Sequence, residues 1–205
     1  MDETDEGTRT WTERDRQREE TRRKVYEAAL EVFRRDGVEK ARIDEIARVA
    51  GVSRGTFYFH FHTKDDVLLE LVHESETKLC DRMEAMPEDA PILEVLDAIA
   101  EHIAAQWSGD PQLLRDIGVV SFRNIARSMD EEREAHPARV ALVPRIRSAI
   151  ARNEVSGLLP AEITSDFFLV NLFGAAVAWV GNPALPLDVL LKSVVQLFMR
   201  AARPD

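Results

Sequence analysis

The sequence predicts an all-α chain in which a small N-terminal group of helices precedes a larger helical domain. Apolar residues recur at helical spacing along most of the chain, and no segment alternates apolar and polar residues between hairpin turns. The chain has 205 residues, of which 45% are hydrophobic, so it can form one large or two small domains with real cores. Counting the periodic segments predicts roughly nine helices in all.

The first helix is expected to run from about Arg14 to Gly37. Residues 1–13 are charged and aperiodic, and they are expected to form a flexible tail. The apolar face of this helix has i, i+3, i+4, i+7 and i+8 spacing and comprises Val25, Ala28, Ala29, Val32 and Phe33. Gly37 stands where a left-handed residue is needed to end the helix.

The segment after it, 41–64, has the layout of a helix-turn-helix. An amphipathic helix near 43–50 leads to Gly51, which supplies the positive φ of the turn. Ser53 is a good N-cap for a second short helix, and Phe57 and Phe61 are expected in the core. Because a helix-turn-helix places its second helix in the major groove of DNA, residues 14–64 are predicted to form a DNA-binding domain.

The second short helix carries side chains suited to DNA. Arg54 can reach guanine edges or phosphate, Gly55 lets the backbone approach closely, and Thr56 can contact a thymine methyl group or a phosphate. Tyr58 and His60 can donate to phosphate oxygens. Lys64, at the start of the next helix, is a further phosphate-seeking cation.

The charge distribution is compatible with this interpretation, although the net charge is −10. The first 64 residues hold equal numbers of acidic and basic side chains, so the rest of the chain carries the whole excess. Without its acidic tip the N-terminal part is mildly basic, which would orient that end toward DNA. Ordinary variation of surface charge is the alternative explanation.

The remainder, 65–205, reads as further helices separated by breaks rich in proline and glycine. Residues 163–180 are apolar on all sides, which requires burial on both faces. The membrane-spanning alternative is disfavoured because Asp166 and Asn171 interrupt the stretch and small residues follow. One face can cover its own domain and the other a second subunit. The monomer core is the alternative use of both faces. The predicted homodimer interface comprises Phe168, Leu172, Ala175, Ala176, Trp179, Leu190, Val194 and Leu197.

The run GVSRGTFYFHFHTKDDVLLELV, residues 51–72, resembles the DNA-binding signature of the TetR family of bacterial regulators. The resemblance covers roughly residues 22–72 and implies that Ser53 also holds a phosphate. It differs at Arg42, where the family commonly has a capping Thr, so Arg42 loses the cap but can keep a phosphate contact. It also differs at Phe59, where a second Tyr is frequent. The resemblance further implies a four-helix dimer interface and a ligand pocket within the C-terminal helices.

The pocket is expected to take a small apolar or aromatic effector, because its candidate side chains offer aromatic surface with few polar groups. The candidates are His102, Gln106, Trp107, Phe122, Asn124, Met129 and Trp179. Each of them could instead be an ordinary core residue.

These observations together predict a dimeric transcriptional regulator, most simply a ligand-responsive repressor of a double-stranded DNA operator. No catalytic spacing or phosphate loop is evident, so we expect neither an enzyme nor a bound cofactor. His60 and His62 point apart on a helix, so no metal site is expected. With Cys80 as the single cysteine and no apolar leader, we expect a cytoplasmic protein, associated with the nucleoid when bound to DNA, and no membrane partner. The alternatives are a helical ligand-binding or enzymatic protein that has lost DNA binding, and an activator or ligand-independent regulator.

Overall fold

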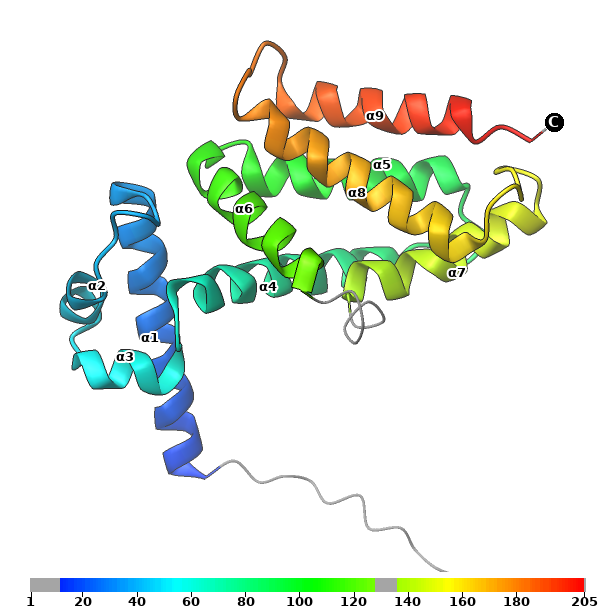
Figure 1. The fold of residues 1–205 in the computed structure, drawn as a ribbon. Helices are drawn as coiled ribbons and strands as arrows, with labels where there is room; N and C mark the ends of the chain where they lie inside the picture. The colour runs from blue at the N-terminus through cyan, green and yellow to red at the C-terminus, as the bar shows by residue number, and fades with distance from the viewer. Residues whose placement is uncertain (1–11, 128–135, 205) are drawn as a thin grey trace, which may run out of the picture. The chain divides into compact units, whose positions relative to one another are not determined.

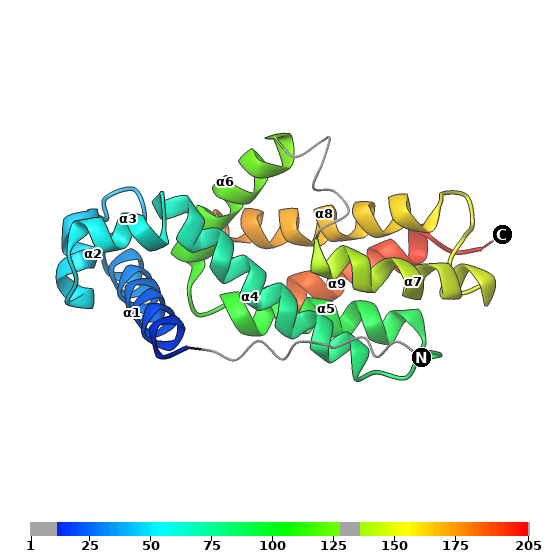
Figure 2. The same ribbon diagram turned by 90° about the horizontal axis from the view of Figure 1, so that it is seen from below.

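The computed structural model describes residues 12–127 and 136–204, with the backbone alone described for 124–127. Within these ranges the chain is entirely helical apart from its connections, which confirms the predicted fold class (Figures 1 and 2). The helices are α1 (Glu13–Asp36), α2 (Ile43–Ala50), α3 (Arg54–His60), α4 (Lys64–Glu84), α5 (Ile92–Trp107), α6 (Pro111–Arg127), α7 (Pro137–Ala151), α8 (Ala161–Trp179) and α9 (Leu187–Ala201). The chain divides into two compact units between Val67 and Leu68, here called the N-terminal and C-terminal units.

The N-terminal unit is built around α1. A capping box opens this helix, because the Thr12 side chain accepts from the Asp15 amide and the Asp15 carboxylate accepts from the Thr12 amide. Gly37 ends it, as predicted, with a positive φ of 78°, but its ψ of 151° differs from that of the expected left-handed helical cap. The apolar face of α1 packs against α2 and α3, and the fully buried aromatic side chains are Phe33, Phe57 and Phe61. The core therefore fixes the short helices α2 and α3 against one long helix.

A second capping box opens α4. The Asp66 amide donates to Thr63 Oγ1 at 3.2 Å, and the Thr63 amide donates to the Asp66 carboxylate at 3.0 Å. Asp66 stands here where Glu is usual in a capping box, and both reciprocal bonds form. The first turn of α4 is thus fixed next to the end of α3.

In the C-terminal unit α5 packs against α9, and α8 packs against α6, α7 and α9. The Arg145 guanidinium on α7 donates to the carbonyls of Met83 and Met86 at 2.7 and 3.0 Å, at and just beyond the last turn of α4. Carbonyls at the end of a helix lack the intrahelical donors of its interior and are satisfied by other groups. The Met83 carbonyl also accepts from the Met86 amide at 3.2 Å, so Arg145 adds a second donor there and ties α7 to the C-terminus of α4.

Helix α8 has the composition predicted for it, but it buries a different face. It is long and apolar enough to cross a membrane by length and composition, with a mean hydropathy of 1.3. Phe168, Leu172 and Ala176 have no exposed surface in the single chain, and the Phe168 ring lies 5.0 Å from that of Phe198 on α9. These three side chains are core residues of one chain, so their prediction as dimer contacts is wrong. A helix that is apolar all round gives no periodic signal for which face turns inward.

The approach of α6 to α8 depends on Gly118. A Cβ atom built at Gly118 would lie 2.7 and 2.8 Å from the two methyl carbons of Val177. A β-branched valine in a helix has one strongly preferred rotamer, so it cannot easily move away. The contact between these two helices therefore requires glycine at this position.

We predict that Gly118→Ala lowers the free energy of unfolding by about 1 kcal/mol. Overpacking should cost about 1–3 kcal/mol, which exceeds the roughly 1 kcal/mol that alanine gains over glycine in a helix. In a Val177→Ala background the same substitution should become stabilising, as measured by urea unfolding. Destabilisation of equal size in both backgrounds would show that Val177 is not the obstacle.

Candidate DNA-binding site

The turn between α2 and α3 is held by one left-handed residue. Gly51 has φ 68° and ψ 31°, and its amide donates to the carbonyls of Ala47 and Arg48 at the end of α2. No atom lies within 4 Å of a Cβ built at this glycine, so conformation and not space selects it. The chain can then leave α2 and enter α3 within three residues.

Ser53 caps α3 as predicted. Its side chain accepts from the Thr56 amide at 3.1 Å and shares a 2.9 Å hydrogen bond with the Thr56 hydroxyl. The two hydroxyl groups therefore satisfy each other at the N-terminus of α3. Both remain on the outer side of the unit, where Ser53 is exposed and Thr56 is half-buried.

Arg54 lies on the exposed surface of α3 and is held by two neighbours. Its guanidinium lies 5.6 Å from the centre of the Tyr58 ring and donates to the Tyr58 hydroxyl at 3.4 Å. The Asp44 carboxylate on α2 is 3.4 Å away. The hydrogen bond to Tyr58 and the charge of Asp44 raise the pKa of Arg54. The cation is thus oriented on its own helix while most of its side chain stays open to solvent.

Asp44 also brings Arg42 into this group. The Arg42 guanidinium lies 3.9 Å from the Asp44 carboxylate, and its side chain is 81% exposed. As expected from the departure at this position, Arg42 makes no side-chain cap for α2. The residues Arg42, Asp44, Arg54 and Tyr58 therefore form one exposed cluster that joins the start of α2 to the surface of α3. Asp44 is a member of it that the sequence analysis did not single out.

The remaining predicted contacts on α3 occupy different surroundings. Gly55 is exposed, and a Cβ atom built there would lie 3.6 Å from Ser53 Oγ, which is an ordinary van der Waals contact. His60 is half-buried, and burial, assisted by the charges of Arg18 and Arg22, lowers its pKa. At neutral pH His60 is therefore uncharged and can still donate one hydrogen bond from its neutral ring.

Lys64 differs from the prediction, because its ammonium group already has partners. It donates to the carbonyls of Val38, Glu39 and Ala41 at 2.5, 3.1 and 3.0 Å. These carbonyls lie in the connection between α1 and α2, which precedes the helix-turn-helix in the sequence. An ammonium group has three donors, and all three are used. The hydrogen bonds of Lys64 therefore join α4 to the connection between α1 and α2. This structural role fits the observed geometry better than the predicted contact with a DNA phosphate.

In the C-terminal unit the predicted pocket residues do not share one environment. His102 on α5 is half-buried, and its Nε2 lies 3.0 Å from the hydroxyl of Ser75 on α4. Burial lowers the pKa of His102, so its ring is neutral at pH 7. Trp107 is buried in the core and Gln106 is half-buried.

The other predicted pocket side chains have different roles or lie outside the described parts of the chain. The Trp179 indole donates to the carbonyl of Leu185 at 2.7 Å and so ties the end of α8 to the following loop. Phe122 is 44% exposed and packs on Phe173 of α8, with ring centres 5.9 Å apart. The side chain of Asn124 and all of Met129 lie outside the described residues.

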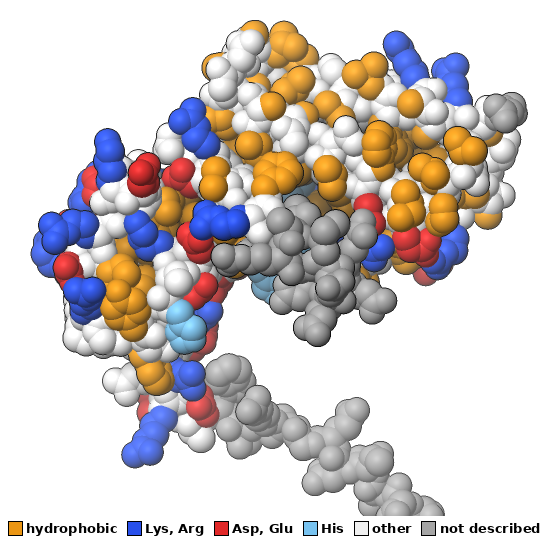
Figure 3. All heavy atoms as spheres, viewed as in Figure 1, with side chains coloured by type: hydrophobic (Ala, Val, Ile, Leu, Met, Phe, Trp, Pro, Cys, Tyr) orange, Lys and Arg blue, Asp and Glu red, His pale blue; other side chains and the backbone are white. Residues whose placement is uncertain are grey.

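The face of α8 opposite the core is apolar and exposed. Ile163, Phe167 and Val170 on α8 are 45%, 57% and 52% exposed, and Val189 and Leu197 on α9 are 44% and 64% exposed. Figure 3 shows hydrophobic side chains gathered over this face of the C-terminal unit, which we call the α8–α9 face. Sequence analysis placed only Leu197 of these five in the interface. The stripe containing Phe167 and Val170 was visible in the sequence, but nothing there showed that it faces outward.

Comparison with known proteins gives the family context. Residues 25–71 match the model of a family described as bacterial regulatory proteins, tetR family. The transcriptional regulator SrpR of Pseudomonas putida is 37% identical over 97 residues, 44% of this chain and 45% of SrpR. The uncharacterised regulator TtgW, also of Pseudomonas putida, is 36% identical over 96 residues, 43% of this chain and 70% of TtgW. The match to SrpR thus spans less than half of that relative.

The fold also resembles solved structures over most of its length. The structure of FadR from Thermus thermophilus, a TetR family repressor in complex with lauroyl-CoA, has a TM-score of 0.70 and 21% identity, and the match covers 87% of this chain and 93% of FadR. Because the match covers 87% of this chain, it includes the folds of both the N-terminal and the C-terminal units. At 21% identity it shows the fold alone.

We predict that Lys64→Met lowers the free energy of unfolding by about 1.5–3 kcal/mol, because hydrogen bonds to a charged group are lost and three carbonyls lose their donor. Thermal unfolding followed by circular dichroism would measure this. Lys40→Met is the matched control, since Lys40 is exposed in the same connection. If Lys64→Met and Lys40→Met are equally stable, the hydrogen bonds of Lys64 do not stabilise the unit.

Proposed function

The chain belongs to the TetR family of bacterial regulatory proteins, and we propose that it is a transcriptional repressor that binds a palindromic operator as a homodimer. In this proposal residues 14–64 bind DNA and residues 65–205 form the dimer and bind an effector. Of the tail expected over residues 1–13, residues 1–11 lie outside the described residues, whereas Thr12 caps α1 and Glu13 begins it. The protein is cytoplasmic and associates with the nucleoid when it is bound to DNA.

One observation carries the proposal: the exposed cluster in which Arg54 and Tyr58 of α3 lie beside Arg42 at the start of α2. The capped N-terminus of a helix after a left-handed turn is the part of a helix-turn-helix that enters the major groove. Arg54 is positioned there by Tyr58 and Asp44, so its conformational freedom is already reduced before binding. Asp44 would be exchanged for a phosphate or a base edge when DNA arrives.

The α8–α9 face supports the homodimer. A monomer that exposes five large apolar side chains on two adjacent helices leaves a surface suited to association. A two-fold dimer places two recognition helices about 34–36 Å apart, on successive turns of one side of the DNA. This spacing gives selectivity that one short helix lacks.

For the effector we propose a small apolar or aromatic molecule bound in the C-terminal unit. FadR of Thermus thermophilus, which shares the fold, was solved with lauroyl-CoA, a ligand with a long apolar chain. Binding must favour the conformation with low operator affinity, and a difference of about 1.4 kcal/mol between the two conformations gives a tenfold effect. Titration with lauroyl-CoA, followed by release of DNA, is a direct first assay of this class.

Gel-shift titrations with duplex DNA from the region upstream of its own gene test DNA binding. The folded dimer should bind a site there more tightly than a mixed-sequence duplex, with an affinity that falls steeply as salt rises. Failure to bind any duplex at low salt would favour the rival function, a helical ligand-binding or enzymatic protein without DNA binding. Reporter expression with and without the protein separates a repressor from an activator.

We predict that Arg54→Ala weakens binding to the selected site and reduces its preference over mixed-sequence DNA, because a base contact typically contributes about 1–3 kcal/mol of discrimination. Arg48→Ala is the matched control, since Arg48 is exposed on α2 but paired with Glu45 at 2.8 Å. The assignment of Arg54 is wrong if both variants lose selectivity equally.

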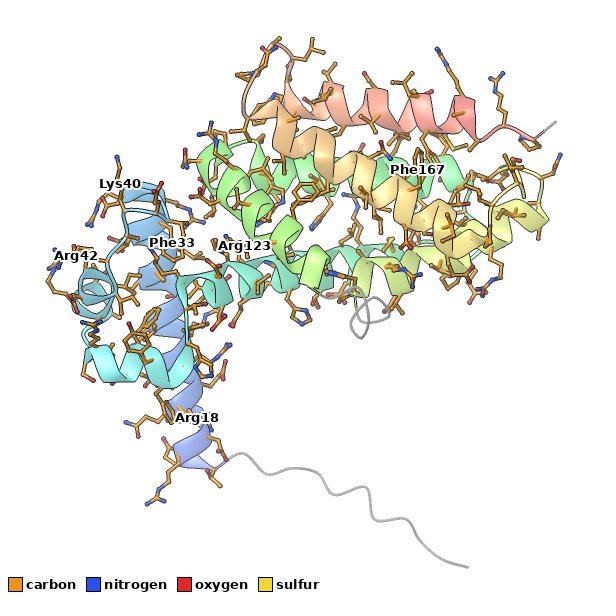
Figure 4. All side chains as sticks on the ribbon, viewed as in Figure 1. Arg18, Phe33, Lys40, Arg42, Arg123 and Phe167 are labelled. Carbon is orange, nitrogen blue, oxygen red and sulfur yellow. The ribbon has the colours of Figure 1, made fainter. Side chains whose placement is uncertain are left out.

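We predict that Phe167→Glu converts the dimer to a monomer in sedimentation experiments. A charge buried in an apolar interface without a partner costs several kcal/mol. Phe167 points away from the ribbon of α8 in Figure 4 and is 57% exposed. Val119→Glu on α6 alters a side chain of equal exposure outside the α8–α9 face and should remain dimeric. A dimeric Phe167→Glu variant would refute this face as the interface.

A further inference from the structure

Arg18 on α1 lies against the recognition helix through an aromatic contact. Its guanidinium carbon is 5.1 Å from the centre of the Phe59 ring, at the distance of a cation–π interaction. Figure 4 labels Arg18 on the part of α1 that extends past α3. The Phe59 side chain is 62% exposed, so this contact lies at the surface and not in the core.

Phe59 belongs to the outward side of α3. It follows Gly55 by four residues, so the two lie one above the other on the helix, beside Arg54 and Tyr58. Phe59 itself has no group that can donate a hydrogen bond. Its ring can instead hold a guanidinium group flat, which leaves the N–H donors at the edge of that group free to meet an oxyanion.

The surroundings of Arg18 are basic. Arg22, one turn further along the same face of α1, has its guanidinium 4.8 Å from the centre of the Phe61 ring. His60, whose ring lies 5.0 Å from that of Phe59, feels the positive charge of both arginines. Glu19 is the acidic group that opposes them there. Two arginines thus flank the end of α3, the opposite end from Arg54.

We propose that Arg18, held on the ring of Phe59, binds a phosphate of the DNA backbone beside the groove that α3 enters. The proposal rests on the proposed function, because it assigns a further contact to the same site. Arg54 then contacts DNA at the start of α3 and Arg18 at its end. The recognition helix is positioned by contacts at both ends, although it has only seven residues.

The test measures binding to a mixed-sequence duplex of about 40 bp across a salt series, for the full-length protein. A phosphate contact is independent of sequence, so it must contribute to binding of this probe. Arg18→Ala should weaken binding by roughly 5-fold per protomer, the order of one charge-assisted contact. It should also reduce the slope of log K against log salt by about 0.9 per protomer. Arg16→Ala is the control, since Arg16 is exposed on the same helix and paired with Glu13 at 2.5 Å.

The role of Phe59 is tested by a double-mutant cycle. Phe59→Ala should weaken binding nearly as much as Arg18→Ala, and the double variant should be little worse than either, because both remove the same contact. Phe59→Tyr keeps the ring and should bind at least as well as the parent. Circular dichroism checks folding, and Arg18→Lys, which keeps the charge without the planar group, should recover part of the salt slope.

The outcomes separate this inference from the proposed function. If the parent protein binds DNA and Arg18→Ala retains the parent affinity and salt slope, as Arg16→Ala does, the Arg18 contact is refuted and the proposed function stands. If the parent binds neither the upstream nor the mixed duplex at low salt, both fail. Additive effects of Arg18→Ala and Phe59→Ala would show that the ring does not hold the arginine.

Discussion

The geometry of the N-terminal unit depends on the left-handed conformation of Gly51. Most residues with a side chain would be strained there, since φ 68° is adopted readily by glycine and only occasionally by other residues such as Asn or Asp. Everything that α3 presents follows from this turn: the cap at Ser53, the cation at Arg54 and the burial of Phe57. The turn sets the direction of α3, and the aromatic core beneath it keeps that direction fixed.

The unit uses its cations in two distinct ways. Lys64 directs all its donors at backbone carbonyls and so stabilises the unit. Arg54 and Arg18 instead lie on aromatic rings of α3, which orient a guanidinium group without satisfying all its donors. Net charge says little about such a surface. An acidic chain can present a small oriented group of arginines wherever its core allows aromatic side chains to reach the surface.

Local features of this protein could be predicted from sequence, and non-local ones could not. The end of α1 at Gly37, the cap at Ser53 and the capping box of Thr63 each involve residues within a few positions of one another. The bonds of Lys64 reach back more than twenty residues to a connection whose path no periodicity describes. The prediction chose the wrong face of α8 for a related reason: Phe168 and Phe167 are equally apolar, and only the packing of α8 against its neighbouring helices decides which of them is buried.

The α8–α9 face has a consequence for how the protein persists in a cell. Burial of this face in the proposed dimer stabilises the folded state only while a second copy is bound. The free energy of unfolding therefore rises with the concentration of the protein itself. A newly made chain at low abundance is less stable than the same chain at steady state. Proteases would then degrade the protein faster at low concentration, where it is monomeric, than at high concentration, where it is dimeric. The protein would accumulate only above a threshold concentration, and this threshold would not depend on an effector.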